Sequence, residues 1–227
     1  MSGNGGNETL TNRLKETSMK CGADLFGVAD ANDFSDYTGK RSPFFYVDSA
    51  RSVIVIGQQI NDPMLDLWIN SVDGKRVYYL VNEILGNIAL EIISALPIQE
   101  KRAVLSPYSG LFSKDAAVLA NLGTIGKNNL LLTKRFGPRV RLRTIITDAE
   151  LIKSSNKPES FCDTCPCFCW SACPADAFAT GQFDREVCAR YSEEHAKRLS
   201  DNSILYCREC EITCPVGKES GWSKNGS

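Results

Sequence analysis

Several features are scarce in this sequence, and each scarcity removes a class of protein. The 227 residues carry a formal net charge of −1, which gives no bulk attraction to nucleic acid or to an anionic membrane. No apolar run is as long as a membrane-spanning helix. Neither a signal peptide nor a twin-arginine leader precedes the first expected helix, so we expect a chain that is not exported. The single histidine, His195, follows two glutamates on a helical stretch, where a surface position is expected.

Cysteine, by contrast, is abundant. Ten cysteines in a chain without a signal peptide predict a reducing cytoplasm and metal ligation. Eight of them fall into two runs that each end in Cys-Pro, with Cys188 isolated between the runs. The first run contains Cys162, Cys165, Cys167, Cys169 and Cys173, and the second contains Cys207, Cys210 and Cys214.

The spacing of these cysteines predicts two [4Fe–4S] clusters. The first run is best aligned as C-x2-C-x3-C-x3-C-P, and Cys188 supplies the fourth cysteine that the second run lacks. In two-cluster ferredoxins a Cys-Pro cysteine ligates the other cluster, so the two runs interlock. We therefore assign two ligand sets: Cys162, Cys165, Cys169 and Cys214 for one cluster, and Cys173, Cys188, Cys207 and Cys210 for the other. Cys167 is left over and can replace Cys165 or Cys169.

Cysteine has other uses in proteins, and they fit this sequence less well. A disulfide framework requires a secreted chain, and no signal peptide is found here. Structural zinc also uses C-x2-C pairs, but two Cys-Pro endings fit iron–sulfur ligation better. Cys21 follows a helical pattern and is expected to be an ordinary buried thiol.

The rest of the chain predicts a larger domain ahead of a small cluster module. Helical patterns or strand patterns alternate over residues 8–155, which indicates an α/β or α+β domain. Residues 156–218 form a ferredoxin-like module organised by its metal, and the Gly-, Ser- and Asn-rich ends, 1–7 and 219–227, are expected to be mobile. We expect a helix over about 77–96, ended by Pro97. The other expected helices cover about 10–21 and 114–122, and strands are expected at 24–30, 51–58, 102–106, 130–133 and 140–148.

One segment resembles a known family. Residues 115–151 read DAAVLANLGTIGKNNLLLTKRFGPRVRLRTIITDAEL. This stretch resembles the A-x-x-G-L-G-x-I-G-K-N-x-L-L segment of epoxyqueuosine reductases and the F-G-P-R-V-R-L region of reductive dehalogenases. Both groups follow it with two [4Fe–4S] motifs, as this chain does.

The resemblance implies an N-terminal domain that holds base-off cobalamin. Electrons from a low-potential donor of the ferredoxin or flavodoxin type would pass through the two clusters to the corrinoid, for reduction of a carbon–halogen, epoxide or related bond. Two glycines would let the backbone approach the cofactor, and nearby side chains would offer it donors. The corrinoid contacts expected on this basis are Gly123, Gly126, Lys127, Asn128 and Asn129. The alternative is a tight turn whose glycines serve only its geometry.

Basic residues follow in the run from Lys134 to Arg143. Arg139, Arg141 and Arg143 are expected on one strand face, opposite Val140 and Leu142. This face is either an anion site, with Arg139 and Arg141 contacting the cofactor, or a solvated face paired with acids elsewhere. The net charge argues against extensive nucleic-acid binding.

The sequence also departs from the family. Epoxyqueuosine reductases place an acidic residue before the glycine motif, but residues 106–110 (SPYSG) contain no carboxylate, and Thr124 replaces the usual tryptophan. Tyr108 is the candidate proton donor, assisted by a cation such as Lys127 or Arg141; the alternative is an ordinary loop tyrosine. The helical-repeat domain of longer epoxyqueuosine reductases has no counterpart in this sequence.

Three functions follow from these patterns. The first is a cobalamin-dependent iron–sulfur reductase. The second is an electron-transfer protein that reduces a partner, for example to reactivate a corrinoid protein, without catalysis of its own. The third is a structural metal module without redox work.

Overall fold

The computed structural model describes residues 3–70, 76–97, 101–155 and 158–218. The chain divides into two compact units. The first comprises residues 1–58, 82–122 and 141–158, and the second comprises 59–81, 123–140 and 159–227. The second unit therefore takes in two stretches that the sequence prediction had placed in the N-terminal domain.

A four-stranded sheet with the order β1-β2-β8-β5 organises the first unit. Its strands are β1 (Leu25–Asp30), β2 (Ser52–Gln59), β5 (Ala103–Leu105) and β8 (Val140–Thr147). β1 pairs antiparallel with β2, and β5 pairs antiparallel with β8. Strands were expected at these four positions, and the mixed α+β class is confirmed.

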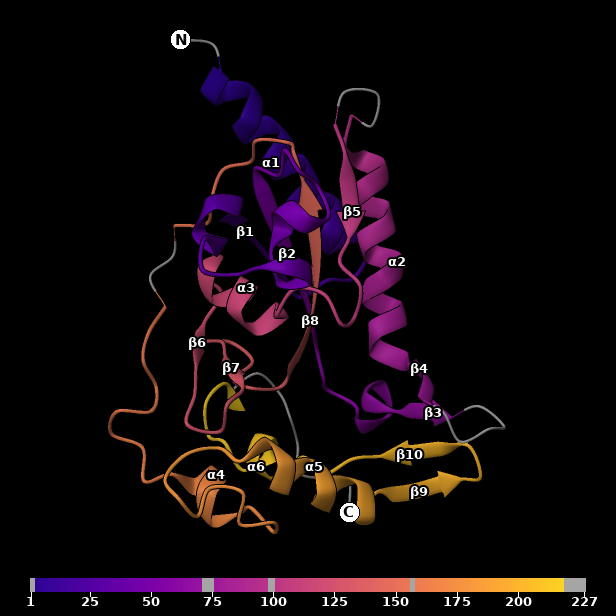
Figure 1. The fold of residues 1–227 in the computed structure, drawn as a ribbon, viewed down its shortest axis with the longest axis vertical. Helices are drawn as coiled ribbons and strands as arrows, with labels where there is room; N and C mark the ends of the chain where they lie inside the picture. Colours follow the sequence, from indigo (N-terminus) through magenta and orange to yellow (C-terminus); the bar gives the residue numbers. More distant parts are fainter. Residues whose placement is uncertain (1–2, 71–75, 98–100, 156–157, 219–227) are drawn as a thin grey trace. The chain divides into compact units, whose positions relative to one another are not determined.

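The core of the first unit lies on this sheet because β2 is apolar on both faces. Val53, Ile54, Val55 and Ile56 are fully buried, as a continuous β-branched run predicts. Helices α1 (Gly3–Lys20) and α3 (Ser113–Leu119) contact β1, and α2 (Leu80–Ala95) runs alongside the sheet (Figure 1).

Helix α2 begins later than the sequence predicted. Residues 77–79, assigned to the helix from the apolar stripe, belong instead to strand β4 (Arg76–Tyr79), which pairs antiparallel with β3 (Trp68–Asn70). The β-branched and aromatic residues of β4 suit a strand, and a paired edge outweighs helical periodicity there. The helix buries Val81, Leu85, Ile88 and Ile92 on one face and ends before Pro97, as expected.

The second unit contains a small sheet that the sequence did not reveal. Its order is β4-β3-β10-β9, with β9 at Lys197–Ser200 and β10 at Ser203–Leu205. The pairing of β10 with β3 places Ile204 opposite Trp68. A two-stranded hairpin, β6 (Thr124–Ile125) with β7 (Leu131–Leu132), belongs to the same unit.

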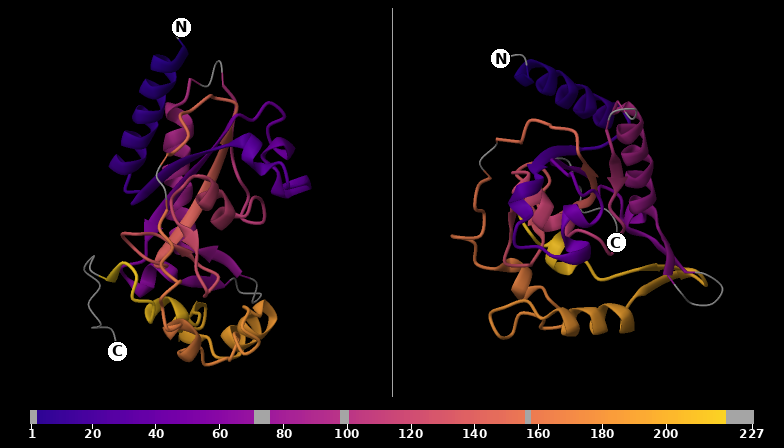
Figure 2. Two further views of the ribbon diagram at one scale, coloured as in Figure 1. Left: turned by 90° about the vertical axis from the view of Figure 1, so that its left-hand side faces the viewer. Right: turned by 45° about the horizontal axis from the view of Figure 1, so that its top comes forward.

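Three of the cysteines lie in short helices. Cys169 lies in α4 (Phe168–Ser171), Cys188 in α5 (Arg185–Glu194) and Cys210 in α6 (Glu209–Ile212). Asp184 caps α5 by accepting from the amides of Glu186 and Val187. α4 contacts α6, so the two cysteine runs lie side by side, as the orange and yellow segments of Figure 2 show.

Four 3-10 turns complete the described elements: Ala31–Phe34, Gly39–Arg41, Pro43–Phe45 and Pro63–Asp66. Of the ends predicted to be mobile, residues 1–2 and 219–227 lie outside the described residues, and residues 3–7 begin α1. Cys21, expected to be buried, is exposed just beyond the end of α1, so that prediction was wrong. None of the helices in the described ranges is long and apolar enough to cross a bilayer.

Candidate metal centre

The β6–β7 hairpin presents the segment Gly126–Asn129 to the cysteine runs of the same unit. The Gly126 amide donates to the Leu130 carbonyl at 2.9 Å, and Asn129 adopts a left-handed conformation with φ of 58°. A Cβ on Gly123 would lie 2.2 Å from the Leu132 carbonyl oxygen, so glycine is required for the two strands to approach. This geometry serves the hairpin itself; corrinoid contact by Gly123, Gly126 and Asn129 stays a prediction.

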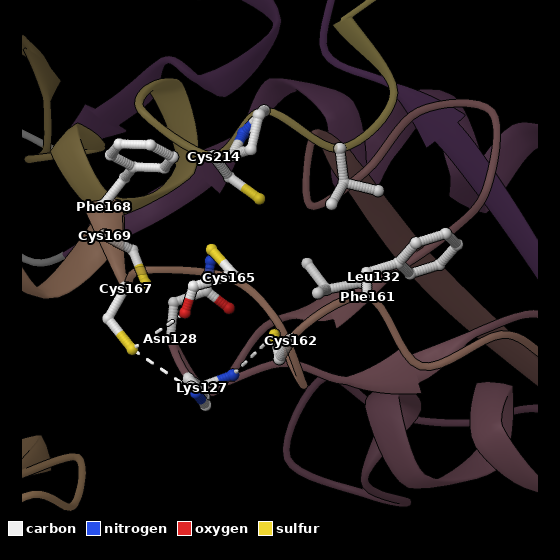
Figure 3. A pocket seen from close by; sticks show the side chains of 12 residues that line it. Lys127, Asn128, Leu132, Phe161, Cys162, Cys165, Cys167, Phe168, Cys169 and Cys214 are labelled. Atoms are coloured by element: carbon white, nitrogen blue, oxygen red, sulfur yellow. Dashed lines mark hydrogen bonds between the residues drawn. The ribbon is translucent and has the colours of Figure 1, made fainter.

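Lys127 holds the hairpin against the first cysteine run through three hydrogen bonds. Its backbone amide donates to Cys162 Sγ at 3.4 Å, and its Nζ donates to Cys167 Sγ, also at 3.4 Å (Figure 3). Its carbonyl accepts from Trp170 Nε1 at 3.0 Å. Donors aimed at ligand sulfurs stabilise thiolate charge and raise the potential of an iron–sulfur cluster.

Asn128 contacts the second run instead. Its side chain is 3 % exposed, its Nδ2 donates to the Cys210 carbonyl at 3.3 Å, and its Oδ1 accepts from the Leu130 amide at 3.2 Å. Lys127 and Asn128, two of the three residues expected to offer donors to a corrinoid, thus direct donors toward the cysteine runs. Their contact with a corrinoid stays a prediction. The hairpin and both runs form one site within the second unit.

Five cysteines line a single pocket with Lys127 and Asn128 (Figure 3). They are Cys162, Cys165, Cys167, Cys169 and Cys214. Four of these are the set that the spacing assigns to one cluster, and Cys167 is the fifth. The structure brings these thiols together; which four of them bind a cluster stays a prediction. In the described part of the chain, no three His, Cys, Asp or Glu side chains form a site for a single metal ion.

Electrostatic interactions sort the buried cysteines in the same way. Burial, together with the charges of Cys214, Cys162 and Cys165, raises the pKa of Cys169 to about 11. Burial also raises the pKa of Cys214, and the charges of Cys162 and Cys165 raise it as well. These thiols stay protonated at neutral pH without metal, so a metal that binds them has to displace protons.

The second predicted set shows a matching pattern. Burial raises the pKa of Cys188, and Cys173 and Cys207 raise it further. Burial, together with the charges of Cys188, Glu211, Cys207 and Cys169, raises the pKa of Cys210 to about 12. The charge of Cys210 thus also interacts with that of Cys169, a member of the first set. Both sets fit the thiolate ligation that [4Fe–4S] clusters require.

Cys167 differs from its neighbours in its backbone. It has φ of 61° and ψ of 43°, a left-handed conformation that costs a non-glycine residue about 1–3 kcal/mol. Its Sγ also lies 3.6 Å from the Cys165 carbonyl oxygen. The strained backbone turns Cys167 toward Lys127, while Cys169 enters α4 and is buried.

A buried ionic network surrounds Arg208, which lies between two predicted ligands. Arg208 Nη2 contacts Glu211 Oε1 at 2.6 Å, and its Nε contacts Asp66 Oδ2 at 3.1 Å. The three side chains are between 4 % and 10 % exposed. The Tyr79 hydroxyl donates to the other oxygen of Asp66, and the Tyr79 ring stacks on Trp68 with centroids 4.2 Å apart. The network anchors the β3–β4 segment to the second cysteine run.

The basic run does not form one solvated face. Arg139 is fully buried, and its guanidinium donates to the carbonyls of Cys214 and Val216 at 3.3 and 2.6 Å. Lys134 is exposed and paired with Glu159 at 2.7 Å, and that hydrogen bond raises the pKa of Lys134. Arg141 is partly exposed and lies in β8.

In the first unit, Tyr108 lies on the loop between β5 and α3. Its side chain is 67 % exposed. Burial lowers the pKa of Arg143, while the charges of Glu83 and Tyr108 raise it, so Arg143 is a cation that interacts with Tyr108. Assistance of Tyr108 by Lys127 or Arg141 stays a prediction. Arg143 Nη1 donates to Asn82 Oδ1 at 3.0 Å, and its buried Nε has no hydrogen-bond partner among the described residues.

His195 is exposed at the end of α5, as expected, and its ring stacks on Tyr191 with centroids 4.1 Å apart.

Comparisons with known proteins find relatives of two kinds. The chain is 25 % identical to the epoxyqueuosine reductase of Cyclobacterium marinum, over 94 % of this chain and 81 % of that protein. It is 44 % identical over 101 residues to the tetrachloroethene reductive dehalogenase of Dehalobacter restrictus, a match that covers 42 % of this chain and 14 % of that protein. The crystal structure of a selenomethionine-labelled epoxyqueuosine reductase superposes with a TM-score of 0.73 at 19 % identity, covering 95 % of this chain and 67 % of that one. The predicted resemblance is confirmed.

These relatives indicate an oxidoreductase with the fold of epoxyqueuosine reductases and reductive dehalogenases. No protein-family model matches the chain. Three interactions in the site could not be predicted from the sequence: the hydrogen bonds of Lys127 to cysteine sulfur, the contacts of Arg139 with backbone carbonyls, and the pairing of Asp66 with Arg208. Each joins residues more than 30 positions apart, and no local pattern marks such contacts.

Proposed function

We propose that the chain is an iron–sulfur reductase that binds two [4Fe–4S] clusters. The observation that carries this proposal is the pocket in which Cys214, from the second run, joins Cys162, Cys165 and Cys169, from the first. Interlocked runs of this kind are the arrangement by which two-cluster ferredoxins share ligands. The proposed sets are those assigned from the spacing, with Cys173, Cys188, Cys207 and Cys210 for the other cluster.

We further propose that the clusters supply electrons to a base-off corrinoid. The fold supports this, since a structure associated with B12-dependent dehalogenation superposes with a TM-score of 0.64 over 96 % of this chain and 34 % of that one. When bound, the corrinoid supplies a strongly reducing metal centre. In the first unit, the buried and unpartnered Nε of Arg143 is a donor that a ligand's acceptor would satisfy. Arg141 would contact the cofactor, and Tyr108, exposed and within the electrostatic reach of Arg143, would donate a proton to the reduced substrate.

The proposed substrate class is based on the two kinds of relative. Both kinds of relative are reductases, and the proposed substrates are small molecules with a carbon–halogen, epoxide or related bond. One similar structure, with a TM-score of 0.68 over 95 % of this chain and 67 % of that one, holds an epoxyqueuosine-modified tRNA stem loop. A modified tRNA stem loop therefore belongs in the substrate screen, although the net charge of −1 led us to expect no nucleic-acid partner. A ferredoxin or flavodoxin would be the electron donor.

A second candidate function is electron transfer to a partner without catalysis. The observation that favours it is the loop at residues 106–110, which has no carboxylate and presents its one tyrosine largely to solvent. Such a protein would bind two clusters and no corrinoid.

The deciding experiment is anaerobic reconstitution with iron and sulfide, followed by titration with cobalamin under visible absorbance and cobalt EPR. Two clusters with a stoichiometric, base-off cobalt(II) signal support the reductase. Two clusters without cobalamin binding support electron transfer, and a colourless protein that takes up zinc instead refutes both. Arg141→Ala should weaken corrinoid binding while iron content is unchanged; unaltered affinity removes Arg141 from the cofactor site.

A further inference from the structure

Arg139 combines full burial with contacts to the loop that ends the second cysteine run. Its two Nη groups donate to the carbonyls of Cys214 and Val216, one on the proposed ligand and one two residues beyond it. A planar guanidinium can bridge two carbonyls at once, whereas an ammonium presents a single point charge. The residue therefore fixes the conformation of the Cys214–Gly217 loop.

The position of Arg139 is itself fixed. Its backbone amide donates to the Phe136 carbonyl at 3.2 Å, and its carbonyl accepts from the Ile60 amide at 2.9 Å. Thr133 and Gly137 bond to each other in both directions, at 2.8 and 3.0 Å, so the turn that carries Arg139 is closed. The guanidinium thus extends from a rigid support.

Glycines allow this turn and the Cys214 loop to pack backbone to backbone. Gly137 has φ of 56°, and a Cβ there would lie 2.0 Å from the Val216 carbonyl oxygen. Gly217 has φ of 70°, and a Cβ there would lie 2.3 Å from the Gly137 nitrogen. Both positions require glycine for space and for conformation.

Arg139 also places a buried positive charge close to Cys214, because its Nη1 lies 3.3 Å from the Cys214 carbonyl oxygen and the side chain is fully buried. The Nε of Arg139 is buried and has no hydrogen-bond partner among the described residues, so an acceptor brought by a ligand would satisfy it.

We propose that Arg139 is a positioning residue that holds Cys214 as a ligand of the cluster bound by Cys162, Cys165 and Cys169, and that its buried charge raises the reduction potential of that cluster relative to the other. The inference rests on the proposed function, because it requires the two clusters. A nearby positive charge stabilises the reduced cluster, which carries one more electron. The segment FGPR thereby has a role in the second unit that is independent of any corrinoid.

The test is a redox titration of the reconstituted protein, followed by EPR and visible absorbance, on three variants. Arg139→Gln removes the charge and should lower the ratio of reduced to oxidised cluster about tenfold at a fixed potential, in one cluster and not in the other; for a one-electron couple this is about 59 mV. Arg135→Gln is the matched control, because Arg135 is exposed and lies over the Phe136 ring at 4.9 Å. It should change neither potential.

Gly137→Ala separates position from charge. It keeps Arg139 but forces the Cys214 loop away, so about half of the iron should be lost. Arg139→Lys keeps the charge and loses the bridge, so it should retain the potential while amide exchange in the Cys214–Gly217 loop becomes faster. This variant stays informative if Arg139→Gln does not fold.

Two results would overturn the inference while the wild-type protein holds both clusters: equal potentials in Arg139→Gln and wild type, or an equal shift in both clusters. Exchange in Arg139→Lys as slow as in wild type would also overturn the bridging role. A wild-type protein that binds no cluster is a different outcome, since it refutes the proposed function itself.

Discussion

The two units of this chain are stabilised by different physics. The first has a sheet whose central strand, β2, is buried along nearly its whole length by aliphatic side chains. In residues 159–218 of the second, the buried apolar side chains are few: Ala177, Phe178 and Ile204, with Cys169 and Cys214. Burial of aliphatic area can support the first unit alone, whereas the cysteine module depends on ligands that draw its loops together.

The largest effect is expected from a substitution that destabilises the second unit and leaves the first unit folded. Cys210→Ser removes a proposed ligand whose carbonyl also accepts from Asn128. We expect iron to fall from about eight to about four atoms per chain, and amides of residues 159–218 to exchange faster while those of β2 and β8 stay protected. Iron analysis and hydrogen exchange measure both.

Two variants in the first unit are the controls for Cys210→Ser. Cys21→Ser, at an exposed thiol outside both sets, should leave the iron content unchanged. Ile54→Ala should reverse the pattern, with a loss of about 2–5 kcal/mol in the unfolding of the first unit and full iron content. If Cys210→Ser retains all its iron, the proposed ligand sets are wrong.

A smaller effect is expected from the ionic network of the second unit. Asp66→Ala leaves the buried Arg208 with Glu211 as its remaining carboxylate partner among those described here. We expect a loss of about 3 kcal/mol, the lower end of the range for breaking a buried ion pair, because one partner is retained. The first unit contains no tryptophan, so tryptophan fluorescence during denaturant unfolding reports on the second. Lys134→Ala, which removes an exposed pair, is the control and should leave the midpoint unchanged. Equal midpoints for Asp66→Ala and wild type would mean that the network is not stabilising.

The smallest effect concerns the first unit at alkaline pH. Burial, together with the hydrogen bond to Asp115, raises the pKa of Tyr37 to about 12. Because the folded-state value exceeds the unfolded value near 10, this contribution is complete below pH 10 and is lost as pH rises toward 12. Tyr37→Phe should therefore flatten the decline of stability over that interval relative to wild type. Parallel curves for the two proteins would show that Tyr37 titrates normally.

Local patterns predicted the first unit better than the second. A continuous apolar run identified β2, the alternation of Val140 and Leu142 with arginines indicated β8, and an apolar stripe over 77–96 identified α2. The burial of each of these elements follows from its own residues. The start of α2 was misjudged since the residues of β4 satisfy helical periodicity as well as strand pairing. The second unit depends on partners far along the chain, such as Arg139 with Val216, 77 residues away. No periodicity encodes such a pair.

The candidate site also has a part that could be predicted from the sequence and a part that could not. The spacing alone predicted two ligand sets, because a Cys-Pro cysteine ligates the other cluster in two-cluster ferredoxins. The structure places the four cysteines of one set, with Cys167, around one pocket, and the ligand sets themselves stay a prediction. What surrounds the sulfurs could not be predicted. Lys127 and Asn128 were expected to contact a cofactor, which stays a prediction, but the donation from these residues to Cys162, Cys167 and Cys210 was not foreseen.

The crossing of Cys214 into the first run has a consequence for how the protein is made. Cys214 follows Cys169 by 45 residues, which at about 5–20 residues per second takes roughly 2–9 s to synthesise. With the proposed ligand set, Cys162, Cys165 and Cys169 wait through that interval as thiols without their fourth partner. Insertion of this cluster is then timed by translation, and a pause of the ribosome between the two runs would lengthen the period in which the first three cysteines are open to oxidation.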